Sequence, residues 1–515
     1  MTVKTDCDLL VIGGGITGAG IALEAARRGL SVMLVEVRDF AWGTSSRSSK
    51  LVHGGLRYLK EGKPGLTRES VHERALLMRD MSGLVEPQPF LMGHYAGRSP
   101  GRWLLGAGLA LYDAFAGVRT RSYHAADPAA WLAPHVGKTG LRGATTYLDA
   151  KTDDARLVLR VLQEARGLGA RLLNYTAVTG LLREAGQVVG AALQGADGAQ
   201  SSVRAAAVVS ATGAWADALR GSLGAPPKLR PLRGSHLLFP LWRLPLAQAI
   251  AFMHPRDGRP VFAYPWEGVA LVGTTDKDHR EDLVQEPGIT RAEADYLFEA
   301  LAWQFPALAL ADADVLSAYA GVRPVVASGH TDPSRETRDH LLLDEAGLLT
   351  VTGGKLTTFR AIARDVLVHL APRLPAAAHD GRPVFAAHPV SPALAALPAP
   401  LRERLVARYG CAAVELVAAA QPGELDAIGG TASVWAELRH AARREQVRHL
   451  DDLLLRRTRL GLLLRDGAAA ILPRLRTIVA QELGWNDARW AQELTRYRDL
   501  IAHCYALPAT ARSAS

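Results

Sequence analysis

DLLVIGGGITGAGIALEAARRGLSVMLVE, residues 8–36, is the stretch that decides the fold of this chain. Its first apolar residues predict a buried parallel strand, and a glycine-rich turn follows at once. A helix with a small-residue face and a second apolar strand complete the unit. In such a unit Gly13 makes the tight turn, Gly15 lets a pyrophosphate approach the backbone, and Gly18 permits close helix packing. Because Glu36 stands where an acid binds ribose hydroxyls, the stretch predicts a dinucleotide-binding fold.

The next segment, GTSSRSSKLVHGGLRYL at residues 43–59, has the composition of a binding site. Its glycines and hydroxyl residues let backbone amides come close to an anion, while Lys50, His53 and Arg57 supply charge or protons. On composition alone, a solvated Ser/Gly linker is the better interpretation. A nicotinamide enzyme normally continues into another βαβ unit at this point. The position of the segment therefore favours a site that contacts the dinucleotide.

Eight motifs in order along the chain resemble those of the FAD-dependent glycerol-3-phosphate dehydrogenases, which are flavoproteins of the D-amino-acid oxidase type. The motifs are GGGITGAG (13–20), TSSRSSKLVHGGLRYL (44–59), SATGAWAD (210–217), RGSH (233–236), GTTD (273–276), GVRP (321–324), TRDH (337–340) and GGKLTTFR (353–360). The resemblance runs from residue 8 to about residue 365, and the remainder resembles the family's helical C-terminal region. One departure is that the family's usual tyrosine three residues after GTTD is absent, because Asp276 is followed by Lys277, Asp278 and His279.

The resemblance implies an α/β fold in which a Rossmann-type FAD-binding domain is interleaved with a mostly antiparallel β-sheet substrate domain, followed by an all-helical C-terminal domain. Apolar periodicity agrees, since it predicts helices over residues 66–82 and 154–167 and leucine-striped helices over 433–448 and 450–464. We expect these boundaries: 1–80, 145–230 and 325–370 for the FAD-binding domain, 81–144 and 231–324 for the substrate domain, and 385–515 for the helical domain.

The resemblance implies FAD as the cofactor and assigns a set of residues to it. They are Gly13, Gly15, Gly18, Glu36, Thr44, Ser45, Lys50, Gly213, Gly354, Leu356 and Thr357. Lysine is scarce in this chain, with nine among 60 basic residues. The presence of Lys50 inside a motif therefore favours a functional role for it. The three cysteines, Cys7, Cys411 and Cys504, have no metal-ligand spacing, and no metal site is expected.

The implied substrate carries a phosphate dianion, which needs fixed cations. The candidates are Arg57, Arg338 and the neutral donor Tyr58 for binding, with Arg323 and Lys355 in catalytic positions. His236 is the preferred proton acceptor or substrate polariser, because histidine titrates near neutral pH. His53 is placed against the flavin, although the division of roles between the two histidines stays open.

The predicted reaction is the oxidation of sn-glycerol 3-phosphate to dihydroxyacetone phosphate by hydride transfer to FAD, with electrons passed to membrane quinone. Two alternatives share the fold: a glycerol-3-phosphate oxidase that uses oxygen, and an FAD-dependent amino-acid oxidase. A dinucleotide-binding sensor without turnover is a further alternative. The formal charge of +9 suits an anionic substrate or membrane surface, and no motif supports a nucleic-acid partner.

The expected location is the cytoplasm, with peripheral attachment to the inner face of the cytoplasmic membrane. The start of the chain shows no targeting segment. An apolar stretch, Trp103 to Val118, is interrupted by Asp113 and is too short to span a bilayer, which needs about 20 residues. It suits an interfacial helix or a buried one equally. The resemblance also admits a homodimer.

Overall fold

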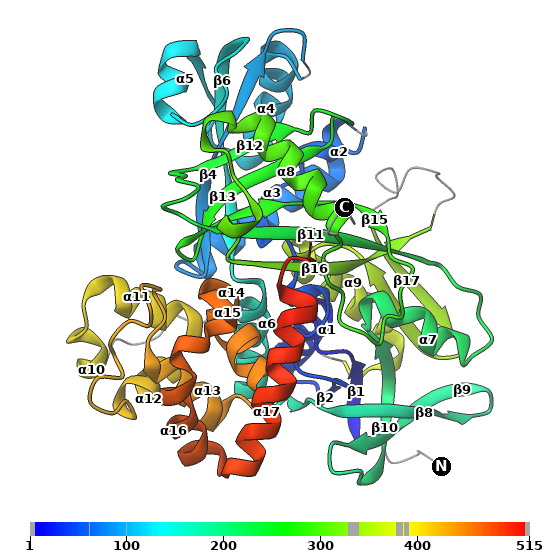
Figure 1. Ribbon diagram of the computed structural model, residues 1–515. Coiled ribbons are helices and arrows are strands. Elements are labelled where there is room, and N and C mark those ends of the chain that lie inside the picture. The colour runs from blue at the N-terminus through cyan, green and yellow to red at the C-terminus, as the bar shows by residue number, and fades with distance from the viewer. Residues whose placement is uncertain are drawn as a thin grey trace, which may run out of the picture.

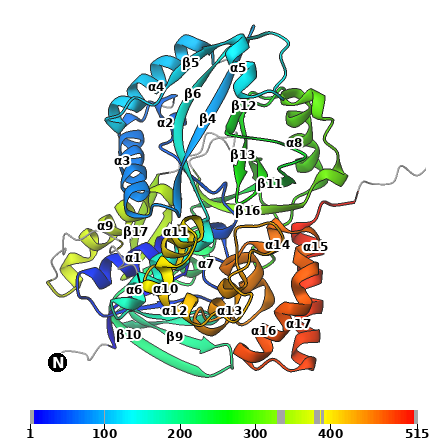
Figure 2. The ribbon, with the colours of Figure 1, turned by 90° about the vertical axis from the view of Figure 1, so that its left-hand side faces the viewer.

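The computed structural model describes residues 6–60, 62–98, 100–327, 339–376, 385 and 391–509 (Figure 1). Two large sheets meet in the middle of the molecule. The helical C-terminal region covers one side of the first sheet, and a small helical end projects beyond the second sheet (Figures 1 and 2). The predicted fold class is confirmed.

The first sheet is the predicted Rossmann-type unit. Its central path runs β17-β18-β10-β1-β2-β7, and all neighbours on it are parallel except the antiparallel edge strand β17. A hairpin of β8 and β9 extends from β10. The strands are β1 (Cys7–Ile12), β2 (Val32–Val35), β7 (Arg171–Leu173), β8 (Thr176–Glu184), β9 (Gln187–Gly195), β10 (Gln200–Ser210), β17 (His340–Glu345) and β18 (Leu348–Gly353).

Three helices, α1 (Ile16–Arg27), α6 (Asp154–Gly167) and α9 (Phe359–Leu370), cover one face of this sheet and share its apolar core. Helix α1 approaches the preceding turn closely, since a Cβ atom at Gly18 would lie 1.9 Å from the carbonyl oxygen of Gly13. Only a glycine fits there, which is the packing role predicted for Gly18.

The second sheet has ten strands and is mostly antiparallel, as predicted. Its path is β15-β11-β14-β13-β12-β4-β6-β3, with β16 on β11 and β5 on β6, and the β4/β12 pair is parallel. The strands are β3 (Leu51–Val52), β4 (Val85–Tyr95), β5 (Ser122–Ala125), β6 (Leu141–Thr152), β11 (Leu229–Pro240), β12 (Ala249–Met253), β13 (Pro260–Trp266), β14 (Val269–Gly273), β15 (Lys277–Asp278) and β16 (Ser317–Val326). Residues 145–152, expected in the FAD-binding domain, continue β6 and belong to this sheet instead.

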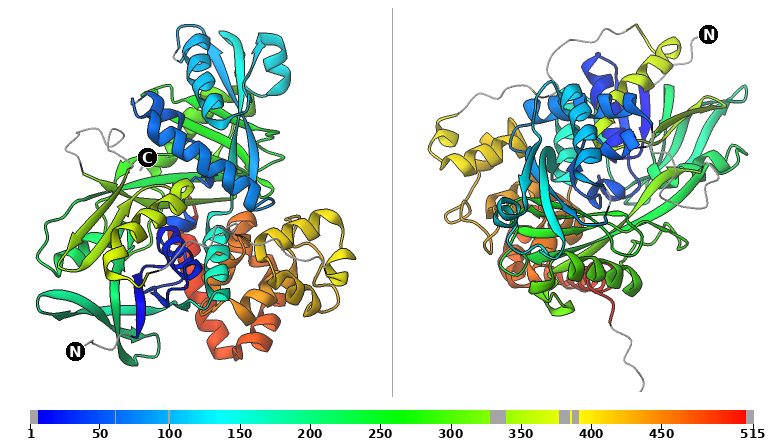
Figure 3. Two further views of the ribbon diagram at one scale, coloured as in Figure 1. Left: turned by 180° about the vertical axis from the view of Figure 1, so that it is seen from behind. Right: turned by 90° about the horizontal axis from the view of Figure 1, so that it is seen from above.

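Helices flank the second sheet on two sides. Helix α8 (Arg291–Gln304) packs on the sheet, and α3 (Pro64–Asp80) contacts α4 (Arg102–Ala116). Helices α4 and α5 (Ala126–Leu132) with β5 form the end of the molecule farthest from the C-terminal helices (Figures 1 and 3). No described helix is both long and apolar enough to cross a membrane.

The C-terminal region is helical, as predicted, but one of its helices is broken. The elements are α10 (Pro392–Ala395), α11 (Ala399–Tyr409), α12 (Ala412–Ala418), α13 (Trp435–Arg444), α14 (Leu460–Leu463), α15 (Arg465–Ala468), α16 (Leu472–Leu483) and α17 (Asp487–Leu500). The predicted helix 450–464 is replaced by a π-helical turn, Asp452–Arg457, followed by the short α14. Arg456, Arg457 and Arg459 on this segment are buried against carboxylates of the first domain, a geometry that a regular surface helix cannot provide.

Candidate active site

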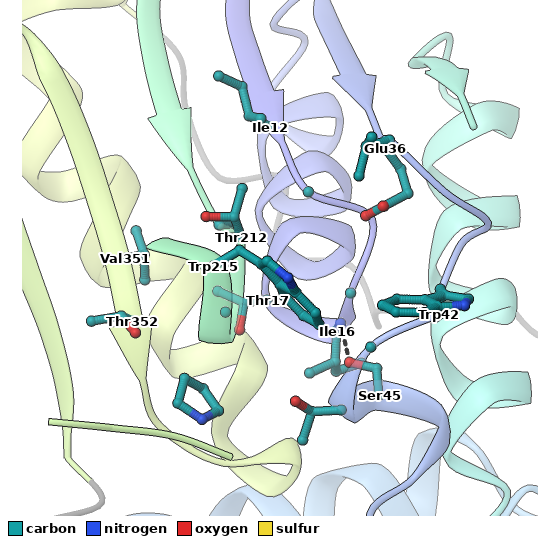
Figure 4. Close-up of a pocket in the computed structure, with 18 of the residues that line it drawn as sticks. Ile12, Ile16, Thr17, Glu36, Trp42, Ser45, Thr212, Trp215, Val351 and Thr352 are labelled. Atoms are coloured by element: carbon teal, nitrogen blue, oxygen red, sulfur yellow. Dashed lines mark hydrogen bonds between the residues drawn. The ribbon is translucent and has the colours of Figure 1, made fainter. Parts of the chain in front are cut away.

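A cavity of about 290 Å³ lies at the carboxyl ends of the parallel strands, where ligands bind in open α/β sheets. The residues that follow β1, β2, β10 and β18 converge on it (Figure 4). Of the residues assigned to the cofactor, those that line it are Gly13, Gly15, Glu36, Thr44, Ser45, Gly213, Gly354 and Leu356. Residues separated by more than 300 positions in sequence therefore share one site.

The turn between β1 and α1 offers backbone amides to an anion. Gly13 adopts a φ of +115°, and a Cβ atom there would lie 2.5 Å from the carbonyl oxygen of Ala211. The first turn of α1 carries no acidic residue. The Ile16 amide donates to Ser45 Oγ over 2.9 Å, which ties segment 43–59 to the helix end (Figure 4). The N-terminus of a helix is electropositive, and the glycine turn before α1 has no side chains that would keep an anion away. This arrangement can bind a pyrophosphate.

Glu36 and two tryptophans also line the cavity. Glu36 Oε2 accepts a hydrogen bond from the Gly14 amide over 2.7 Å, and Oε1 accepts one from the Arg38 amide over 2.9 Å. Burial raises the pKa of this carboxyl above its ordinary value. The rings of Trp42 and Trp215 lie 5.7 Å apart and form part of the wall (Figure 4). An acid beside a flat apolar wall suits a nucleoside.

Lys50 lies elsewhere than predicted. Its side chain is fully buried, and Nζ donates to Asp154 Oδ1 and to the Ser46 carbonyl, each over 2.9 Å. The ammonium also faces the rings of Trp266 and Tyr319 at 5.0 and 4.7 Å. Burial lowers its pKa to about 8. Lys50 therefore stabilises its own segment through buried contacts and does not line the cavity.

A cation also lines the cavity. Lys355 lines it, with Nζ 2.6 Å from Ser70 Oγ and 3.9 Å from the centre of the Tyr58 ring. Thr357 does not line the cavity; its hydroxyl donates to the His53 carbonyl over 3.2 Å. The segment 43–59 and the motif at 353–360, both singled out in the sequence, thus meet here.

His236 and Arg323 lie beside the cavity, on β11 and β16, and not among its lining residues. His236 is 1% exposed, stacks on Tyr319 with ring centres 4.7 Å apart, and contacts Ser49 Oγ through Nε2 at 2.9 Å. Burial, and then the charges of Arg323 and Lys50, hold its pKa well below the ordinary value. The ring is therefore neutral, the form that offers a nitrogen lone pair, and its lowered pKa makes it a weaker base than a free imidazole.

Arg323 is oriented by the GTTD motif. Its guanidinium donates to Asp276 Oδ1 and to Thr274 Oγ1, each over 3.0 Å. Its neighbour Pro324 lines the cavity, and the Thr44 hydroxyl donates to the Val322 carbonyl, so β16 abuts the cofactor segment.

The side chains of two predicted site residues cannot be placed in the described structure, and the site also contains contacting residues that were not predicted. Arg338 is not among the described residues, and the Arg57 side chain is likewise outside them. Four contacting partners were not predicted as site residues: Ser49, Ser70, Asp154 and Asp276. Asp276 stood inside a recognised motif, whereas nothing in the local sequence distinguishes Ser49 or Ser70 from the other serines. His279, at the place of the family's tyrosine, is buried, and neither of its ring nitrogens has a hydrogen-bond partner among the described residues.

The chain matches two protein-family models and has similar relatives among known proteins. The family model described as FAD dependent oxidoreductase matches residues 8–365, and the model described as C-terminal domain of alpha-glycerophosphate oxidase matches residues 352–490. Aerobic glycerol-3-phosphate dehydrogenase of Staphylococcus epidermidis is 39% identical over 378 residues, which cover 72% of this chain and 68% of that protein. The Staphylococcus aureus enzyme of the same name is 39% identical over 375 residues, covering 71% and 67%.

Two solved structures show the same arrangement. The glycerol-3-phosphate dehydrogenase of Bacillus halodurans complexed with FAD is 29% identical, with a TM-score of 0.74 over 98% of this chain and 95% of that chain. The L-alpha-glycerophosphate oxidase of Mycoplasma pneumoniae with FAD bound is 19% identical, with a TM-score of 0.60 over 74% and 98%. At that identity the second likeness shows the fold alone.

Proposed function

This chain belongs to the family of FAD-dependent oxidoreductases that includes the aerobic glycerol-3-phosphate dehydrogenases, and we propose that it oxidises sn-glycerol 3-phosphate to dihydroxyacetone phosphate. The residues present fit FAD, because the glycine turn leaves no room for side chains and Glu36 stands at the nucleoside end. When bound, FAD supplies the acceptor for the hydride.

The observation that carries the substrate assignment is the position of Lys355. Its ammonium stands at the cavity between Ser70 and the face of Tyr58, where it can meet an anionic group of a substrate beside the flavin. Arg57 and Arg338 would add the fork-shaped donors that a phosphate favours. His236 would take the proton of the substrate hydroxyl, and Arg323, held by Asp276, would polarise the developing carbonyl.

The direct test is reduction of the flavin by the substrate. The yellow holoenzyme is mixed anaerobically with glycerol 3-phosphate, and the flavin absorbance is followed. Bleaching supports the proposal, whereas a flavin that stays oxidised contradicts it. Glycine and proline serve as controls, because an amino-acid oxidase of the same fold would be reduced by an amino acid instead.

An oxidase is the second candidate, because residues 352–490 match a domain named for alpha-glycerophosphate oxidase. The two activities differ in how the reduced flavin is reoxidised. We expect rapid reoxidation by a water-soluble quinone analogue and slow reoxidation by air. Rapid reoxidation by air with release of peroxide would favour the oxidase.

The quinone would be reached at a membrane surface, and α4 supports this part of the proposal. Large apolar side chains face solvent along α4 and the turn after it: Trp103 (81% exposed), Leu104 (68%), Leu111 (42%) and Val118 (55%). We call these four residues the α4 stripe. Asp113, which interrupts the apolar stretch in sequence, is buried and paired with Arg121 over 2.6 Å.

The surroundings of the α4 stripe suit an anionic bilayer. Trp131 on α5 is 87% exposed at the same end of the molecule (Figure 2). Arg102 stacks on Tyr123 beside the α4 stripe, with its guanidinium 3.6 Å from the ring centre. Apolar side chains flanked by arginines bind lipid interfaces that carry negative charge. We propose that this end of the molecule binds the inner face of the cytoplasmic membrane.

The homodimer stays a prediction, and sedimentation velocity can measure the oligomeric state.

A further inference from the structure

The His236 ring is confined on its faces and has one described partner on its nitrogens. Tyr319 stacks on it at an interplanar angle of 16°, and a Cβ atom at Gly273 would lie 2.2 Å from its Cδ2 atom. Nε2 lies 2.9 Å from Ser49 Oγ, whereas Nδ1 is buried and has no hydrogen-bond partner among the described residues. The Ser49 hydroxyl is therefore the described group that can fix this ring through a nitrogen.

The charges around the ring oppose its protonation. Arg323 on β16 and Lys50 both lie near enough to disfavour a further positive charge on the ring, which has lost nearly all contact with water. The Tyr319 hydroxyl is turned away to the Ser48 carbonyl, to which it donates over 2.7 Å. A base in these surroundings needs an acceptor for the N–H of its protonated form.

We propose that Ser49 is a positioning residue for His236: the Ser49 hydroxyl orients the ring and accepts a hydrogen bond from Nε2–H when Nδ1 takes up the proton of the substrate hydroxyl. In this step the O–H bond of the substrate breaks and an N–H bond forms at Nδ1, which leaves the substrate as an alkoxide and His236 as an imidazolium. The inference rests on the proposed function, in which His236 is the proton acceptor. Ser49 acts through His236 and needs no contact of its own with the substrate.

The structure holds Ser49 firmly in place. The Tyr264 hydroxyl donates to the Ser49 carbonyl. Asp154 accepts hydrogen bonds from the amide and hydroxyl of Ser48 over 3.0 and 2.7 Å. Arg459 of the C-terminal region pairs with Asp154 and donates to the Ser46 carbonyl over 3.1 Å. Residues 46–49 are thus fixed on both sides of the hydroxyl that meets His236, as preorganisation requires.

The test compares three variants in the anaerobic flavin-reduction experiment, followed by stopped flow. Ser49→Ala should lower the limiting reduction rate between about tenfold and a hundredfold, the range for losing one hydrogen bond to a charged group. The half-saturating glycerol 3-phosphate concentration and the FAD content should stay as in wild type. Ser49→Thr should restore most of the rate. Ser235→Ala is the matched control, because it removes a buried hydroxyl next to His236 that bonds Glu293 over 3.0 Å and not the ring.

Several results would overturn the inference: a wild-type rate for Ser49→Ala, no recovery with Ser49→Thr, or equal losses for Ser49→Ala and Ser235→Ala. A substrate-free measurement separates this failure from failure of the proposed function. The ¹⁵N chemical shifts of the His236 ring, identified with a His236→Gln variant, should change in the FAD-loaded Ser49→Ala enzyme. Unchanged shifts would contradict the contact, whatever the substrate proves to be.

Discussion

Lys50 shows at the scale of one residue how burial changes the meaning of a charge. A lysine among serines and glycines suggests an anion site, yet this ammonium is enclosed between Asp154 and two aromatic rings. The cavity is lined by Thr44, Ser45 and Ser48 of the same segment. Lys50 thus shapes the cavity by fixing the segment that lines it.

Replacing Lys50 separates a structural role from cofactor binding. Lys50→Met removes one partner of a buried carboxylate, and we expect the free energy of unfolding to fall by about 3 kcal/mol, the usual cost of breaking a buried ion pair. The dissociation constant for FAD should change less than threefold. Urea unfolding and flavin fluorescence titration measure the two quantities. If the free energy of unfolding is unchanged and the affinity for FAD falls tenfold or more, Lys50 binds the cofactor and the structural role is wrong.

The lowered pKa of Lys50 also predicts a dependence of stability on pH. The native pKa is about 8 and the ordinary value is 10.5, so the unfolded chain binds the proton more tightly. The cost of burying the ammonium is present below pH 8 and disappears as pH rises from 8 to 10.5. The unfolding free energy of wild type should therefore rise relative to Lys50→Met across this window.

Arg57 is predicted from the sequence to bind the phosphate of the substrate. Loss of a charge-assisted contact to phosphate costs about 1.5–3 kcal/mol, so Arg57→Ala should raise the KM for glycerol 3-phosphate between about tenfold and a hundredfold while FAD stays bound. Steady-state kinetics with a quinone analogue measure this effect. Arg68→Ala, at an exposed cation on α3, is the control. Loss of FAD with unchanged KM would show that Arg57 faces the cofactor.

Helix α4 has two faces with different partners, which is the central observation at the scale of elements. Its inner face carries Tyr112, whose hydroxyl accepts from the Gly54 amide over 2.9 Å and donates to Asp149 over 2.7 Å. Its outer face carries the α4 stripe. One helix therefore supports the site segment from one side and exposes apolar surface on the other.

The α4 stripe predicts where lipid binding can be removed without unfolding the protein. Trp103→Ser combined with Leu111→Ser should reduce cosedimentation with phosphatidylglycerol vesicles at least tenfold, because each burial of such a side chain contributes about 1.5–3 kcal/mol. Activity with a water-soluble acceptor should be retained. Val368→Ser, at an exposed valine on α9, should bind vesicles like wild type. Equal binding by all three proteins would contradict the proposed membrane face.

At the scale of the whole molecule, buried ion pairs join the C-terminal region to the first domain. Asp39, which is fully buried after β2, accepts from Arg456 Nε and Arg457 Nη1, each over 2.6 Å. Asp153 accepts from Arg408 and Arg459 over 2.6 and 2.9 Å. Buried charges of this kind are costly unless all partners are present, so the contact favours one mutual arrangement of the two regions.

This network predicts weakening in acid. Burial alone would raise the pKa of Asp39, but the charges of Arg457 and Arg456 outweigh it and hold the pKa below its ordinary value. The stabilisation is therefore present above about pH 4, the unfolded pKa, and is lost as pH falls further. Asp39→Asn should lower the unfolding free energy at pH 7 by about 3–5 kcal/mol and flatten its decline between pH 5 and 3. Urea unfolding over pH 3–7 measures both, and a variant as stable as wild type would contradict the account.

The sequence by itself determined the parts of this protein whose signals are local. A strand, a glycine turn and a helix are neighbours in the chain, so Gly13, Gly18 and Glu36 could be placed from spacing alone. The motif at 353–360 could likewise be assigned to the same site through the family resemblance.

Only the tertiary structure decided the roles that depend on distant partners. The contact of Ser49 with His236 spans 187 positions, and that of Arg457 with Asp39 spans 418. Lys50 and Asp113 are buried because partners elsewhere in the chain, Asp154 and Arg121, pair with their charges. Whether a polar side chain faces a ligand, a partner or water is set by the free energy of desolvating it, and that depends on what the rest of the chain brings beside it.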